Sequence, residues 1–351
     1  MDRYQVMKAA FQALSLTGAN RVLCPFTRGR GVVFTLHHVR PWQPAAFAPN
    51  RLLEITPEFL DLTLNATREA GFEIISLTQA VSRLKNNEQH AKPFAVFTSD
   101  DGYKDNRDYA QPIFQKYNAP WTLFVTTGFA EATAPLWWSD FHDAVSAQDQ
   151  LEWTDEAGKH YILPARTPAE KQCSANKMYW NLRSGSEAHL RQTIAAMVKE
   201  HKIDSLKRVR ELCLTWQELG ELSNDPLVSI GAHTLTHPML AKQKLADVVE
   251  EIKKSREIIQ EQLQCCANHL AYPVGDPTSA GQREFQVAKD LGFDVALTTR
   301  AGHIFKEHAQ HMHAWPRISL NGLFQNKTAL NAMLSGVPFM LWNKWQRLNV
   351  A

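Results

Sequence analysis

The segment Phe94-Ala-Val-Phe-Thr-Ser-Asp-Asp-Gly102 decides how the chain is organised. Its residues 94–98 form a short apolar and β-rich run, which predicts a buried strand. Two adjacent carboxylates, Asp100 and Asp101, follow the strand, and an Asp-Gly pair is a common turn. The functional alternative to a simple turn is that one carboxylate binds a divalent ion while the other takes a proton from water.

Strands and helices alternate on both sides of this segment. Alternation of this kind favours a parallel sheet with crossover helices, in which functional groups gather at the carboxyl ends of the strands. The expected strands are residues 31–36, 72–76, 94–98, 121–126, 228–232, 269–272, 295–299 and 315–319, and the expected helices are 57–70, 77–84, 109–117, 244–262 and 279–291.

The alternation of expected strands and helices divides the chain into parts. Residues 31–134 and 214–320 are expected to form an α/β barrel, for which the length of the chain is suitable. Residues 135–213 interrupt the alternation and are expected to be a helical insertion. Residues 1–30 are expected to be an N-terminal helical segment, and residues 321–351 a C-terminal helix that either packs on the barrel or lies at a membrane surface.

Charge and cysteine content narrow the class of protein. The formal net charge is only +2 and no basic stripe occurs, which argues against a nucleic-acid partner. The five cysteines are odd in number and include no Cys-x-x-Cys pair, so we expect a reducing, cytoplasmic location rather than a disulfide framework. Neither a signal peptide nor a transmembrane segment is predicted, because the apolar runs are too short.

The segment His233-Thr-Leu-Thr-His237-Pro238 directly follows the strand expected at 228–232. Histidines four residues apart lie on one side of a helical turn, so this spacing predicts that both imidazoles bind one ion. With one aspartate of the first segment they give a His₂Asp set that leaves positions open for water and substrate. Because the other aspartate can then serve as a general base, the constellation suits hydrolysis of an amide or ester.

Three segments match one family in the family's own order. Residues 98–102 resemble the T-F-D-D-G motif of polysaccharide deacetylases, and residues 233–238 resemble their H-[ST]-x-x-H-[PS] motif. Ala271-Tyr-Pro-Val-Gly275 resembles the F-A-Y-P-Y-G variant of the third motif. The resemblance covers residues 30–320 and is to carbohydrate esterase family four, which includes chitooligosaccharide deacetylases. It implies a distorted (β/α) barrel, here of about seven strands.

The resemblance also implies roles for individual residues. Asp100 would be the general base, and Asp101, His233 and His237 would hold one divalent metal ion, usually zinc. The backbone N–H of Tyr272 would stabilise the oxyanion, and Pro273 beside it in the same motif would also bind substrate.

Two expected residues are missing from their usual places. No arginine lies within residues 269–275 to orient the base, and Arg317 is the candidate replacement, an ordinary strand-end ion pair being the alternative. The usual late Leu-x-His motif is not evident, but Thr35-Leu-His-His-Val39 resembles the Tyr-His-x-Val element of members whose acid lies early. The general acid would then be His37. His38 is the fallback and His303 a weaker rival.

Aromatic residues at the start of the insertion are candidates for substrate binding. Trp138, together with Trp137, could stack on the apolar face of a sugar ring. The alternative is that both rings simply pack in the core of the insertion. A further departure from the family pattern is Ser99, which stands where many members have phenylalanine.

These features predict a metal-dependent hydrolase that removes an N-acetyl or other acyl group from an amino sugar of a cell-envelope glycan or its precursor. A cytoplasmic location would favour a precursor or a lipid-linked sugar. Two alternatives remain, namely a deacylase of a small amide or O-acetyl ester, and a non-catalytic glycan-binding protein on a deacetylase scaffold. Two aspartates beside the histidine pair disfavour the binding protein, because binding alone needs no uncoordinated base.

Overall fold

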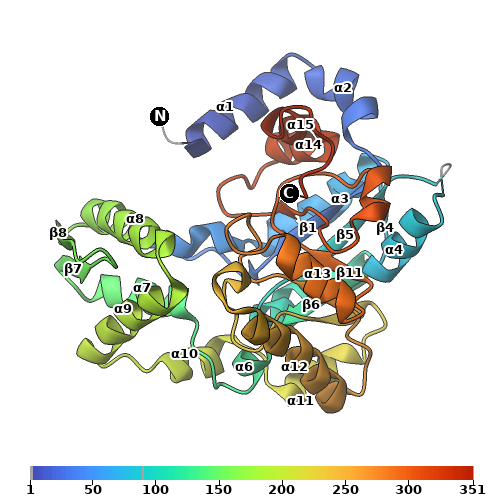
Figure 1. Ribbon diagram of the computed structural model, residues 1–351. Coiled ribbons are helices and arrows are strands. Elements are labelled where there is room, and N and C mark those ends of the chain that lie inside the picture. The colour runs from blue at the N-terminus through green and yellow to red at the C-terminus, as the bar shows by residue number, and fades with distance from the viewer. Residues whose placement is uncertain (1–2, 89–90, 351) are drawn as a thin grey trace.

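Parallel strands form the main sheet of the computed structural model, which describes residues 3–88 and 91–350 (Figure 1). Seven strands lie side by side in the order β11 (Val295–Leu297), β10 (His269–Ala271), β9 (Val228–Ala232), β6 (Trp121–Val125), β5 (Phe94–Ser99), β1 (Gly31–Leu36) and β12 (Ile318–Ser319). An eighth strand, β4 (Glu73–Ile74), pairs with the start of β5. The sheet curls into a half-barrel, which confirms the expected distorted (β/α) barrel.

The two ends of this sheet approach each other. Trp315, which lies just before β12, donates its backbone N–H to Ala296 and accepts from Thr298, so it runs beside β11. The central strands β1, β5 and β6 are buried along their whole length, as expected for a parallel sheet that is covered on both faces.

Strand register brings the polar residues predicted from sequence to one edge. Leu36 pairs with Ser99, so the residues that follow them, His37 and Asp100, leave the sheet together. In the same way, β6 and β9 end level with each other at the residue before His233. Because carboxyl ends of parallel strands share an edge, the candidate residues meet there.

Helices cover the sheet where the sequence indicates them, with one addition. At α3 (Pro57–Glu69) the predicted N-cap is confirmed, since the Thr56 hydroxyl accepts from the Phe59 N–H at 3.2 Å. Helix α11 (Trp216–Ser223) was not expected. The other covering helices are α4 (Leu77–Lys85), α5 (Gln111–Lys116) after a π-turn (Asn106–Ala110), α12 (Leu245–Leu263) and α13 (Gln282–Asp290). Smaller elements are β2 (His38–Val39), β3 (Glu54–Ile55) and the 3₁₀ turns Pro49–Leu53, Leu240–Lys242 and Lys306–Gln310.

The segment expected to be a purely helical insertion also contains a hairpin. After the short α6 (Thr127–Ala130), the chain forms α7 (Trp137–Ser146), α8 (Pro168–Ser184), α9 (Glu187–Glu200) and α10 (Ser205–Leu212). Between α7 and α8, β7 (Gln150–Thr154) pairs in antiparallel fashion with β8 (His160–Pro164). The helical expectation was wrong here because β7 alternates exposed and buried side chains, the pattern of a half-buried strand. In Figure 1 the hairpin and helices α7, α8 and α9 form a lobe at the side of the barrel.

Both ends of the chain are helical. The N-terminal segment forms two helices, α1 (Arg3–Leu16) and α2 (Ala19–Thr27), while Met1 and Asp2 lie outside the described residues. The C-terminal segment was expected to be one helix and instead forms α14 (Lys327–Ser335) and α15 (Val337–Trp342). Gly336 separates these two with φ of 76°, a conformation that glycine adopts without strain.

Substituting Gly231 should show how tightly the sheet packs beneath the site. An added Cβ would lie 2.5 Å from the Phe124 ring, so Gly231→Ala should lower the free energy of unfolding by about 1–3 kcal/mol through overpacking. Urea denaturation measures this value. The matched control is Gly220→Ala in α11, where the nearest atom lies 4.0 Å away and helix propensity should add up to about 1 kcal/mol. Equal stabilities of the two variants would contradict the packing argument.

Candidate functional site

Arg317 forms two hydrogen bonds with the carboxylate of Asp100. The guanidinium donates from Nη1 to Oδ1 at 2.7 Å and from Nη2 to Oδ2 at 2.8 Å, a bidentate arrangement. Arg317 also donates to the Thr98 hydroxyl at 3.2 Å and to the Thr298 carbonyl at 3.0 Å. Both partners are almost completely buried, at 2% and 1% exposure. Arg317 is therefore no surface ion pair but contacts the very residue it was expected to orient.

Charge keeps Asp100 ionised despite its burial. Burial raises the pKa of this carboxyl, but the positive charges of Arg317 and His233 outweigh that effect and hold the pKa below its usual value. Asp100 therefore stays a carboxylate near neutral pH and can accept a proton.

Asp101, His233 and His237 converge beside this pair. Asp101 Oδ1 lies 3.5 Å from Nε2 of His233 and 3.4 Å from Nε2 of His237, and all three side chains are buried. One ligand atom from each lies within 4.8 Å of the others. Within the described part of the chain, no other group of histidine, cysteine or acidic residues meets this criterion for holding a metal ion.

The hydrogen bonds of this cluster suit a bound cation. His233 Nδ1 lies 2.7 Å from the Ala271 carbonyl, which fixes the proton on Nδ1 and turns the Nε2 lone pair toward Asp101. Asp101 Oδ1 has no hydrogen-bond partner among the described residues, although it is buried. Because a buried, unpaired carboxylate oxygen is costly, an ion bound between oxygen and imidazole nitrogens would satisfy it. The three residues therefore fit a divalent metal.

The two imidazoles differ in their protonation. Burial lowers the pKa of His237 to about 3, an effect that the charge of Asp101 only partly offsets. Burial also lowers the pKa of His233, but there the neighbouring carboxylates of Asp101 and Asp100 prevail and the pKa is raised. A neutral His237 presents a lone pair to a metal at all ordinary pH values.

The histidine segment is a loop, so the expected helical turn was wrong. Thr234 and His237 have φ of 67° and 57°, which an α-helix excludes. The N–H groups of Leu235 and Thr236 donate instead to the Glu251 carboxylate of α12, at 2.8 and 2.9 Å. This carboxylate satisfies the donors that a helix would have used, and the ring centroids of the two histidines still approach to 4.9 Å.

Helix α9 of the insertion holds the far end of the same loop. Glu187, 3% exposed, accepts from the Met239 N–H at 2.7 Å and from Nε of Arg191 at 2.8 Å. Arg191 in turn donates to the His237 carbonyl at 2.9 Å. We call Glu187 and Arg191 the loop clamp. Sequence reasoning missed it, because the partners lie far apart in the chain.

Of the three candidate acids, only His37 lies among the charged groups of the site. Its pKa is lowered by burial, against the influence of Asp101 and Asp100, which raise it. Its carbonyl accepts from the Asn106 side chain at 2.9 Å and lies 3.3 Å from the Ser99 hydroxyl, which donates to the Asn106 side-chain oxygen. Ser99 thus joins the ends of β1 and β5, a polar contact that phenylalanine at this position would lack.

His38 and His303 are occupied elsewhere. Nδ1 of His38 lies 2.6 Å from Asp105 Oδ2, and the ring stacks on Tyr103 with centroids 3.6 Å apart. The ring nitrogens of His303 lie 2.9 Å from the Arg28 carbonyl and 2.8 Å from the Met333 carbonyl, between the terminal helices. Neither arrangement offers a proton to a substrate at the Asp100 edge.

The oxyanion role expected for Tyr272 is wrong. Its backbone N–H donates to the Leu297 carbonyl at 3.0 Å within the sheet, and its buried hydroxyl donates to the His313 carbonyl at 2.9 Å. Pro273, also buried, follows, and its substrate-binding role stays a prediction. The N–H of Val274 has no acceptor among the described residues, and φ of 60° is an outlier for a β-branched residue. The free donor of this motif is therefore Val274.

Trp138 lies at the site, whereas Trp137 is core. The Trp138 ring centroid lies 4.8 Å from that of His237, and its Nε1 donates to the Tyr103 hydroxyl at 3.2 Å. Trp137 is 6% exposed and stacks on Tyr179. Tyr103, which sequence reasoning did not single out, has its pKa raised by burial and by the nearby charge of Asp101, so it stays a neutral hydroxyl.

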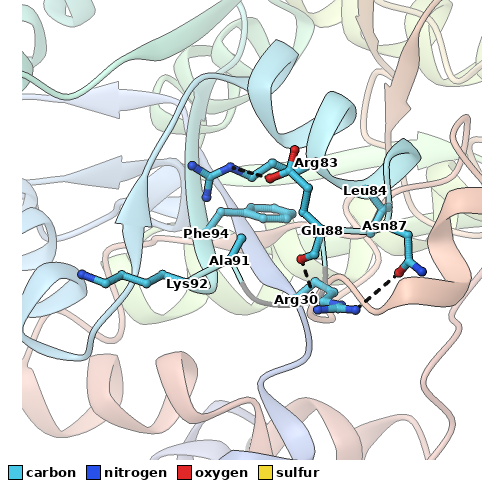
Figure 2. A pocket seen from close by; sticks show the side chains of 8 residues that line it. All are labelled: Arg30, Arg83, Leu84, Asn87, Glu88, Ala91, Lys92 and Phe94. Carbon is cyan, nitrogen blue, oxygen red and sulfur yellow. Dashed lines mark hydrogen bonds and ion pairs between the residues drawn. The ribbon is translucent and has the colours of Figure 1, made fainter.

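A separate pocket opens at the opposite edge of the sheet and does not belong to this site (Figure 2). Arg30 precedes β1 and Phe94 begins β5, which places the pocket at the amino ends of the strands. Its two arginines have partners, since Arg83 pairs with Glu73 at 2.9 Å and Arg30 donates to the Asn87 side chain at 3.4 Å.

A double-mutant cycle should reveal the buried pair. Arg317→Met or Asp100→Asn alone should each lower the free energy of unfolding by about 3–5 kcal/mol, because the remaining charge is left buried without its partner. The double variant should lose clearly less than the sum of the two. Urea denaturation at neutral pH measures all four proteins. Additive losses would contradict a direct pairing.

The same pair predicts a pH dependence. Since the pKa of Asp100 in the folded protein lies below its ordinary value of 3.8, the pair contributes stability above that pH and loses it as the pH falls through the folded value. The double variant should lack this part of the acid sensitivity. An unchanged slope of stability between pH 5 and 3 (approximate limits for carboxyl titration) would contradict the assignment.

Comparisons with known proteins agree with the observed fold and with the arrangement of the site. A search of curated proteins finds no match. Solved structures with the same fold include the *Streptococcus pyogenes* deacetylase PplD in complex with acetate (20% identity, TM-score 0.57, 88% of this chain and 99% of that chain). IcaB from *Ammonifex degensii* is also similar (16% identity, TM-score 0.54, 87% and 98%). So is the de-N-acetylase from *Aggregatibacter actinomycetemcomitans* (14% identity, TM-score 0.53, 86% and 98%).

At these identities the structural likeness concerns the fold. The family model described as polysaccharide deacetylase matches residues 87–296, more than half of the chain, including both aspartates and both histidines. The chain therefore belongs to the polysaccharide deacetylase family, whose members are hydrolases that act on carbon–nitrogen bonds other than peptide bonds.

Proposed function

We propose that this chain removes an N-acetyl or other acyl group from an amino sugar of a cell-envelope glycan or its precursor, with one divalent ion, zinc in our proposal, held by Asp101, His233 and His237. The observation that carries the proposal is the buried Asp101–His233–His237 cluster beside the Asp100–Arg317 pair. Deacetylases of this family use a divalent metal. Two imidazoles and one carboxylate suit a catalytic zinc site, because they leave positions open.

A bound ion would polarise the acyl carbonyl and lower the pKa of the attacking water. Asp100 takes the proton of that water, and Arg317 holds its carboxylate in place without using all of its lone pairs. The Val274 N–H donates to the oxygen on which negative charge develops. His37, with its lowered pKa, is a strong acid once protonated and gives its proton to the leaving amine.

Substrate recognition is proposed to involve Trp138. Its partly exposed ring lies against His237, where it can stack on the apolar face of a sugar. A small amide or an O-acetyl ester would use the same groups, and substrate screening separates these alternatives. The cytoplasmic location rests on the cysteine pattern and stays a prediction; it would favour a precursor or lipid-linked sugar as substrate.

Acetate release and zinc content, measured on the same variants, should distinguish the general base from the metal ligands. Asp100→Asn should keep its zinc content but lose about 10²–10⁴-fold in acetate release from N-acetylated sugars, since it lacks the proton acceptor. Asp101→Ala and His237→Ala should lose bound zinc as measured by metal analysis. Full activity in Asp100→Asn would remove the base assignment, and stoichiometric zinc in both ligand variants would remove the metal site.

The loop clamp predicts an effect on metal affinity from outside the ligand set. Arg191→Ala frees the His237 carbonyl, so the dissociation constant for zinc should rise about 10-fold or more. Competition with a chelating dye measures it independently of turnover. Arg208→Ala is the matched control, because Arg208 pairs with Asp143 inside the insertion at 2.6 Å and does not touch the loop. Equal zinc affinity in the two variants would contradict a positioning role for the clamp.

A further inference from the structure

The two ends of the chain build one helical layer on the barrel. Helices α1 and α2 pack on α14 and α15, at the top of the view in Figure 1. The Thr27 hydroxyl donates to the Ser335 carbonyl at 2.6 Å, and a Cβ on Gly336 would lie 2.3 Å from the Thr27 carbonyl oxygen. The end of α2 is therefore in close contact with the junction of α14 and α15.

Helix α2 buries polar side chains and exposes apolar ones, the reverse of the usual arrangement on a globular protein. Its buried side chains are the polar Asn20 and Thr27, and Asn20 accepts from the Ser335 hydroxyl at 3.2 Å. Val22 and Phe26, four residues apart on the opposite face, are 72% and 71% exposed. A helix on a globular protein normally buries its apolar stripe. Exposed apolar faces of this kind mark surfaces that bind something else.

Helix α15 and the residues after it add large aromatic side chains to this layer. Trp342 and Trp345 are 61% and 55% exposed, while Val337, Phe339 and Met340 of the same segment are buried. Since α15 contacts α2, these indoles belong to the same layer as Phe26. Tryptophan combines an apolar ring with a polar N–H and is enriched where a bilayer meets water.

The charge of the two terminal segments has one sign. Residues 3–53 contain seven lysines and arginines, residues 308–351 contain four, and neither segment contains Asp or Glu. Arg21 on α2 and Lys344 between the two tryptophans are exposed. Acidic groups just outside these segments pair with four of the cations. Glu307 lies 3.6 Å from Arg347 and Glu69 lies 3.1 Å from Lys327, while Glu54 lies 2.6 Å from Arg40 and Asp100 lies 2.7 Å from Arg317. Apolar side chains with a positive surround complement an anionic lipid surface.

We propose that α2, α15 and residues 343–347 form a docking surface for an anionic lipid bilayer, with Phe26, Trp342 and Trp345 at the boundary of headgroups and acyl chains. Arg21 and Lys344 lie with the phosphates. The attachment is peripheral: no helix among the described residues is long and apolar enough to cross a membrane. A polyanion such as a nucleic acid would engage the cations but leave the exposed apolar rings in water. The inference does not depend on the proposed deacetylation.

Vesicle binding by the whole chain of residues 1–351 tests the proposal. The protein should co-float with vesicles of phosphatidylcholine and phosphatidylglycerol mixed equally, bind vesicles of phosphatidylcholine alone less, and bind less at high salt. The triple variant Phe26→Ser/Trp342→Ser/Trp345→Ser should bind the mixed vesicles at least about 10-fold more weakly. Arg21→Gln/Lys344→Gln should lose the preference for phosphatidylglycerol. All substituted side chains are exposed, so thermal unfolding should be unchanged.

The matched control is Trp180→Ser on α8 of the insertion, where the indole is 51% exposed, and it should bind as the unsubstituted protein does. Absence of binding to both kinds of vesicle would overturn the proposal, as would equal binding by the triple variant. A dimer in sedimentation that the triple variant loses, with no vesicle binding by either protein, would assign the surface to a second copy of the chain and overturn it as well.

Discussion

Asp100 and Arg317 lie side by side and are almost completely buried, where either charge without its partner would be strongly destabilising. Asp100 directly follows the central strand β5, while Arg317 directly precedes β12 at the edge of the sheet. The pair therefore ties the last strand of the barrel to the strand that carries both aspartates. The guanidinium reaches the carboxylate because β12 pairs with β1, which in turn pairs with β5. The most polar contact of the site is thus also a constraint on the fold.

The barrel supplies the reactive groups, and the insertion completes their surroundings. Trp138 begins α7 and lies against His237, and α9 holds the loop that carries His237 through Glu187 and Arg191. The Val274 side chain packs on the hydrophobic cluster of the insertion, which also contains Met239 from the histidine loop. Loss of the insertion would leave the strand ends in place but remove the contacts that orient two of the loops between them.

What could be predicted from the sequence was local. Apolar runs predicted the strands, and Thr56 with Pro57 predicted where α3 begins, because helix caps and apolar periodicity depend on a few neighbouring residues. Motif resemblance then identified Arg317, whose partner lies 217 residues away. The helical turn at His233 failed because Glu251 of another helix takes its N–H groups. Tyr272 failed because Leu297 of the neighbouring strand takes its N–H group. Both are tertiary contacts, which local spacing does not contain.

Strained backbone conformations are concentrated around the proposed metal site. Four of the eleven non-glycine residues with positive φ in the described chain are Asp101, Thr234, His237 and Val274. Each such residue costs on the order of 1 kcal/mol or more, so surrounding contacts must hold it in place. Those contacts come from the protein itself: Glu251 and the loop clamp hold the histidine loop, and the Thr299 hydroxyl donates to the Val274 carbonyl at 2.6 Å. Contacts within the protein therefore restrain the ligand residues independently of the proposed ion.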